Sequence, residues 1–148
     1  MERKLDEKTE AIFRAAIARI PEGETSCQIG ADDGAYMPLH VEKIGTILHG
    51  NPDAPIRSTL YSFAHYFEQN GDLMRDPDIC IEDNGPGGLR PTSFRNDALG
   101  IDQEVYAHNS AGYVIGIREK LLHELCQFCK TWGENLNGTD TICTEAEI

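Results

Sequence analysis

Two strand-like segments and the turn between them occupy residues 58–83, STLYSFAHYFEQNGDLMRDPDICIED. The first segment, 58–68, is rich in aromatic residues, which favour the pleated surface of a sheet. Asn70-Gly71 follows it, and this dipeptide is typical of the two-residue turn of a β-hairpin. The return segment contains Pro77, which lacks a backbone N–H and therefore indicates an edge strand or a bulge. The centre of the chain is predicted to be antiparallel sheet.

Similar patterns extend the sheet in both directions. Residues 37–41 alternate between apolar and polar side chains, and residues 89–96 and 102–107 are expected to form a second hairpin. Apolar residues then recur at three- and four-residue steps near both ends of the chain, which predicts helices over 3–20 and 114–136. We therefore expect one α+β domain, with an antiparallel sheet of about four to six strands and both helices on one face. Its expected parts are an N-terminal helix in 1–24, the sheet in 25–107, a C-terminal helix in 114–136 and a loose tail in 137–148.

Composition narrows the classes of function. The chain has 148 residues, 40% of them hydrophobic, and a formal net charge of −12. This charge excludes nucleic-acid binding by general electrostatics and disfavours an anionic membrane surface as partner. No apolar stretch is long enough to span a membrane, and the first residues lack a signal-peptide pattern, so we expect a cytoplasmic protein. The five cysteines are expected to be reduced thiols.

The C-terminal helix contains the pattern His123-x2-Cys126-x2-Cys129, whose spacing resembles half of a zinc site. Such pairs usually lie on a turn. Here a helix places Cys129 on its apolar face, Cys126 at the edge of that face and His123 toward solvent. We therefore predict no metal and no other cofactor, and interpret the two cysteines as small core residues beside Phe128 and Trp132, which are predicted to be buried.

His65 is a candidate catalytic residue, because a histidine near Glu68 and Asp72 can act as a general base or bind a metal. His40, on the neighbouring predicted strand, reaches His65 in only one strand register. The alternative is that His65 packs across strands and that Asp72 belongs to turn chemistry. The enzymatic hypothesis, a small metal-dependent or hydrolytic enzyme, is therefore the second choice.

Carboxylates are concentrated on the predicted central hairpin. Acidic side chains spaced along a strand can imitate a row of phosphates and occupy a basic channel of another protein. The alternative is a solvated acidic face that maintains solubility, and charge alone favours this alternative. The candidate interaction surface consists of Asp72, Asp76, Asp78, Glu82 and Asp83.

Three stretches resemble a known family: YMPLHVEKIG from residue 36, SFAHYFEQNGDLMRDPDICIE from residue 62 and RPTSFRNDALGIDQEVY from residue 90. Together they are similar to small proteins of bacterial plasmids, phages and conjugative elements, a domain of unknown function. The resemblance covers roughly residues 28–136. It implies a mobile-element context and supplies no catalytic residues. Combined with the charge, it leads to the hypothesis of a non-enzymatic accessory protein that binds a basic protein, such as a host defence protein, and does not bind nucleic acid directly.

Overall fold

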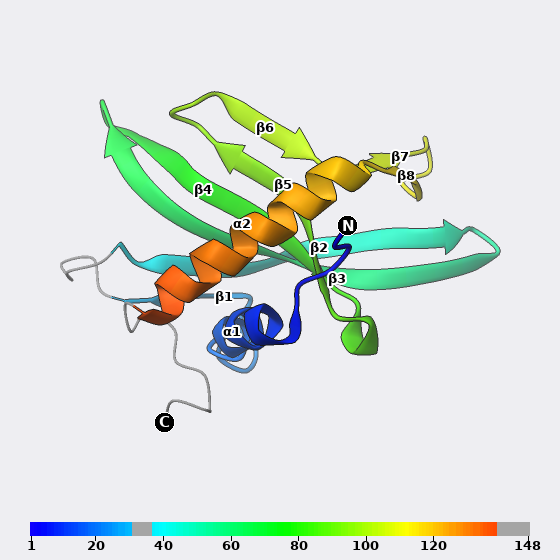
Figure 1. The fold of residues 1–148 in the computed structure, drawn as a ribbon, viewed down its shortest axis with the longest axis horizontal. Helices are drawn as coiled ribbons and strands as arrows, with labels where there is room; N and C mark the ends of the chain where they lie inside the picture. The colour runs from blue at the N-terminus through cyan, green and yellow to red at the C-terminus, as the bar shows by residue number, and fades with distance from the viewer. Residues whose placement is uncertain (31–36, 139–148) are drawn as a thin grey trace.

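Residues 1–30 and 37–138 are described by a computed structural model, shown in Figure 1. Six antiparallel strands pair in the order of the sequence, and a separate two-stranded hairpin precedes the second helix. The α+β prediction is confirmed. The elements are α1 (Glu7–Ile17), β1 (Ser26–Ile29), β2 (Leu39–Asn51), β3 (Ala54–Gln69), β4 (Asp72–Asp83), η1 (Gly85–Gly87), β5 (Leu89–Asn96), β6 (Ile101–Glu104), β7 (Tyr106–His108), β8 (Val114–Ile117) and α2 (Glu119–Gly138).

The turn between β3 and β4 is the one that the sequence predicts. Asn70 and Gly71 have φ angles of 55° and 85°, so both adopt the positive values that a type I′ turn requires. The prediction for Pro77 is half right. β4 lies between β3 and β5, so it is not an edge strand. A bulge does occur, because the register shifts between Ala64 and Tyr66 on β3, opposite Pro77.

The helix boundaries differ from the predicted ones. α1 begins after Asp6, whose side chain accepts a hydrogen bond from the Thr9 N–H at 2.8 Å and caps the helix. α2 begins at Glu119 rather than at 114, because Val114–Ile117 pairs with β7 as a strand. A short apolar run with β-branched residues fits either a helix or a strand, and the tertiary pairing decides. Residues 137 and 138 of the predicted tail end α2, and the remainder lies outside the described residues.

Both helices cover the same face of the sheet, as Figure 1 shows. Phe13 of α1 contacts Phe63 of β3 at a ring-centroid distance of 5.0 Å, and Phe128 of α2 contacts Phe94 of β5 at 5.1 Å. Register places Phe63, Ile79 and Phe94 in one row across the sheet. Trp132 is buried as predicted, whereas Phe128 is only half-buried because it lies at the margin of the core.

The β2–β3 hairpin extends beyond its neighbours. β1 pairs with β2 only at residues 39–42, and β4 pairs with β3 only from residue 59 onward. Residues 44–58, here called the arm, therefore pair mainly with each other, and in Figure 1 the arm projects to the right. A single bridge joins Leu48 in the arm to Tyr113 before β8. Among the described residues, no helix is long and apolar enough to cross a membrane.

Candidate functional site

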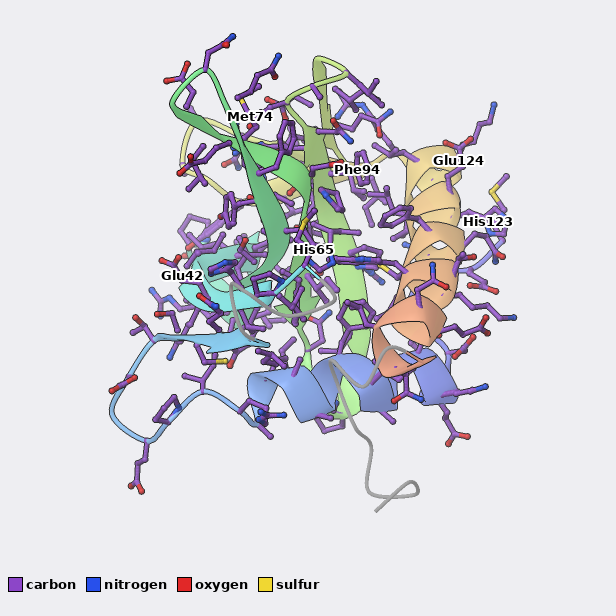
Figure 2. The ribbon with its side chains drawn as sticks, turned by 90° about the vertical axis from the view of Figure 1, so that its left-hand side faces the viewer. Glu42, His65, Met74, Phe94, His123 and Glu124 are labelled. Carbon is purple, nitrogen blue, oxygen red and sulfur yellow. The ribbon has the colours of Figure 1, made fainter. Side chains whose placement is uncertain are left out.

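The two candidate catalytic histidines do not form a site together. His65 Nδ1 donates to the Pro38 carbonyl oxygen at 2.9 Å, and its ring lies 5.3 Å from that of Trp132 on α2. Figure 2 shows His65 between the sheet and that helix. Burial lowers the pKa of His65 below its usual 6.5. His40 instead contacts Tyr66 at 5.1 Å, and neither histidine has a hydrogen bond to a carboxylate in the described part of the chain.

The three residues with metal-like spacing on α2 also diverge. Cys126 and Cys129 are both buried, so Cys126 lies deeper than the predicted edge position. Burial raises the pKa of the Cys126 thiol to about 12 and that of Cys129 well above its ordinary value. His123 lies on the outer side of α2 in Figure 2, and its Nδ1 accepts the backbone N–H of Glu2 at 3.0 Å. Within residues 1–30 and 37–138, no three metal-ligating side chains come together.

The predicted acidic surface must be corrected. Glu82 has no exposed surface and Asp78 is buried, so neither side chain belongs to an outer face. Asp83 is half-buried and forms an ion pair with Arg14 at 3.1 Å. Of the five carboxylates, only Asp72 is exposed, and Asp76 is half-buried. The predicted row of carboxylates requires that one side of β4 faces solvent. The side of β4 away from the helices is instead partly covered, because the arm and β7 contact Glu82 there.

Glu82 is instead the centre of a buried polar network. Its Oε2 accepts hydrogen bonds from Ser58 Oγ at 2.6 Å and from His49 Nε2 at 2.9 Å. Its Oε1 accepts the Tyr106 hydroxyl. Arg90 Nη1 in turn donates to the Tyr106 oxygen at 3.0 Å. The arm and β7 thus meet β4 at one carboxylate, and β5 joins them through Tyr106; we call these five residues the Glu82 network.

The network holds its carboxylate in the ionised form. Burial opposes ionisation of Glu82, but the three hydrogen bonds from His49, Ser58 and Tyr106 outweigh it and lower the pKa below 4.5. Burial, together with the bond to Glu82, raises the pKa of Tyr106 far above 10. A serine nucleophile is activated when its hydroxyl donates to a histidine, which in turn is held by a carboxylate. Here the Ser58 hydroxyl donates to Glu82 and not to His49, so Ser58 is not activated in this way. The arrangement is suited to joining the strands, not to covalent catalysis.

A cavity of about 240 Å³ lies next to the network, on the side of the sheet away from the helices. Tyr106 forms part of its wall, and Cys80 and Ser93 contribute from neighbouring strands. Two charged side chains, Arg95 and Glu104, also line the cavity and are paired with each other at 3.5 Å. Burial raises the pKa of Cys80 to about 11, so this thiol is not activated as a nucleophile.

The tips of the β3–β4 and β5–β6 hairpins form a second feature, called here the hairpin end and defined as residues 68–76 and 96–100. Figure 1 shows both tips directed the same way. Asp97 binds the Arg75 guanidinium through two contacts of 3.0 Å, and Asn96 donates to Asp76 at 2.9 Å. Two leucines are exposed there, Leu73 by 65% and Leu99 by 71%.

A family model described as a domain of unknown function (DUF6908) matches residues 8–139. The chain belongs to this family. The match spans every described strand, α2, all of α1 except Glu7, the Glu82 network and the hairpin end. No curated protein and no solved structure matches the chain.

The Glu82 network of this DUF6908 chain has no local signature in the sequence. Ile79 and Ile81 alternate with Glu82, which predicts a carboxylate on the solvent side of β4. Its three donors are distant in the sequence: Ser58 and Tyr106 each lie 24 positions away, on opposite sides, and His49 lies 33 positions away. Only the fold brings them together, because strand alternation does not predict what covers the second face of a sheet.

Proposed function

We propose that this protein is a non-enzymatic, cytoplasmic binding protein of a mobile genetic element, and that it binds a basic protein through the hairpin end. The supporting observation is that this surface combines exposed leucines with carboxylates, on two hairpin tips that the Arg75–Asp97 ion pair holds together. Leu73 and Leu99 are more than half exposed. Glu68 lies opposite Leu73 and Asp72 precedes it; both carboxylates are exposed and form no ion pair with any described residue. Apolar anchors surrounded by charge are typical of protein interfaces.

The charge of the whole chain supports the same class of partner. A formal charge of −12 attracts a basic surface over distances of about 8 Å at physiological salt and repels nucleic acid. The Arg75–Asp97 pair fixes the two tips relative to each other, so less conformational freedom is lost on binding. A defence protein whose basic channel normally holds nucleic acid is a partner of the required chemistry.

The hydrolytic alternative has less support. His65 packs against Trp132, His40 packs against Tyr66, and neither is hydrogen-bonded to a carboxylate in the described residues. A general base needs such contacts or a nearby substrate site to act.

The test is affinity capture from bacterial lysate with the wild type and with a triple variant, Glu68→Gln, Asp72→Asn and Leu99→Ser. The matched control, Glu22→Gln with Glu24→Gln, removes two exposed carboxylates from the loop after α1. We expect a basic protein to be captured by wild type and control, and about tenfold less by the variant or when salt rises to about 0.5 M. Equal capture by all three proteins, or a mobility shift of duplex DNA at physiological salt, would contradict the proposal.

A further inference from the structure

The end of the molecule away from the hairpin end has no net charge, because the two charged residues within 44–58 and 105–117, Asp53 and Arg57, have opposite signs. No Asp, Glu, Lys or Arg occurs in residues 44–52, 54–56 or 105–117, although the chain has 25 acidic and 13 basic residues. These residues form most of the arm and the β7–β8 hairpin, which lie on the right in Figure 1. We call them the uncharged end.

The parts of the uncharged end are joined to one another. Leu48 on the arm forms its bridge with Tyr113 at the β7–β8 turn. The ring of His49 lies 5.4 Å from that of Tyr106, and both side chains bind the Glu82 carboxylate. Segments about 60 residues apart in the sequence therefore form one end of the molecule.

Large apolar side chains are exposed on this end. Ile44 is 46% exposed, Ile56 is 63% exposed and Ile115 is 66% exposed. Ile56 lies directly opposite His49 in the β2–β3 register, and Ile115 lies on β8. Ile115 has no charged neighbour in the sequence, whereas Ile44 follows Lys43 and Ile56 precedes Arg57. Large exposed apolar side chains at one end of a molecule are typical of surfaces that another molecule covers.

Apart from the bridge between Leu48 and Tyr113, the outer edge of β2 along the arm has no strand partner among the described residues. The last hydrogen bond between β1 and β2 runs from the Lys43 N–H to the Thr25 carbonyl. Leu48 pairs with Tyr113, on the side of β2 that faces away from β3. Backbone N–H and C=O groups alternate in direction along a strand, so those of Thr46 and Gly50 also face away from β3. Natural edge strands are usually protected by charged residues or proline, and residues 44–51 contain neither.

We propose that a second copy of this chain covers the uncharged end, in a symmetric dimer. Two molecules with a charge of −12 repel each other, and the repulsion is least at a surface whose own net charge is zero. A two-fold axis brings the same surface of both copies together. A surface with no net charge, exposed isoleucines and a largely unpaired strand edge allows this. A basic partner gains little from a surface whose one exposed carboxylate, Asp53, is balanced by Arg57, so this surface is separate from the hairpin end.

The test is analytical ultracentrifugation of the full chain over a range of concentrations. We expect a monomer–dimer equilibrium whose association constant increases between about 0.05 M and about 0.5 M salt, because screening weakens repulsion between like-charged copies. This direction is opposite to that expected for a basic partner at the hairpin end. Failure of one proposal therefore leaves the other intact.

Two variants locate the interface. Ile56→Asp and Ile115→Asp place a charge on the uncharged end, and each should weaken dimerisation by at least about tenfold. Leu73→Asp and Leu99→Asp are the controls, because these leucines are similarly exposed, at 65% and 71%, and lie at the hairpin end. Unchanged circular dichroism of all four would show that the fold is intact. A protein that is monomeric at every concentration and salt, or controls that weaken the dimer equally, would overturn the proposal.

Discussion

The hydroxyl of Tyr106 donates a hydrogen bond to the carboxylate of Glu82 inside the protein, and Glu82 has no exposed surface. An ionised carboxylate away from water is destabilising unless donors compensate for its lost hydration. Here His49 and Ser58 bind the other oxygen. The arm and β7 are thus attached to β4 through one side chain, which makes that side chain the most informative position for mutation.

Replacing Glu82 with Gln should lower the free energy of unfolding by about 1–3 kcal/mol, because the amide cannot accept all three hydrogen bonds. Urea unfolding followed by circular dichroism measures the change. The control is Asp72→Asn, a similar change at an exposed turn, with an expected effect within about 0.5 kcal/mol. Equal effects of the two substitutions would show that the network does not stabilise the fold.

Stability should decrease in acid partly through Glu82. Its pKa is lower in the folded protein than its ordinary value of 4.5, so the unfolded chain binds the proton more tightly. The stabilisation is complete above about pH 5 and is lost as the pH falls through 4.5 toward the folded pKa. The difference in unfolding free energy between wild type and Glu82→Gln should therefore shrink below pH 4.5. A difference that stays constant from neutral to acid pH would contradict this.

Tyr106→Phe keeps the ring and removes only the hydroxyl that links Glu82 to Arg90. We expect a loss of about 1–3 kcal/mol, because Glu82 loses a donor and Arg90 loses an acceptor. In a double-mutant cycle with Glu82→Gln, the combined loss should be at least about 0.5 kcal/mol smaller than the sum of the single losses. Simple additivity would mean that the two side chains act independently.

Trp132→Ala should cost about 3–5 kcal/mol, because the indole packs against Phe13 and His65 and its removal leaves a cavity. Phe128→Ala should cost less, since that ring is only half-buried. Chemical denaturation of both variants checks the order. A loss below about 1 kcal/mol for Trp132→Ala would show that α2 does not pack as described.

Thiol labelling should distinguish the four described cysteines. Cys27 is half-buried, whereas Cys80, Cys126 and Cys129 are buried. A thiol reagent at neutral pH should therefore modify Cys27 first and leave Cys129 unmodified until the protein unfolds, because only the thiolate reacts. Peptide mass spectrometry of the labelled protein identifies the sites. Rapid native labelling of Cys129, or a disulfide between it and Cys126, would contradict its place in the core.

Local patterns in the sequence determined the α+β class, the Asn70-Gly71 turn, the bulge opposite Pro77 and the apolar side of α2. These features depend on residues close together in the chain, through turn geometry and periodicity. Only the tertiary structure decided that Val114–Ile117 is a strand and that Glu82 is buried, because β7 and the arm supply the partners for both regions. The same holds for the expected acidic row: alternation assigns Glu82 to the outer side of β4, but it cannot show that distant segments cover that side.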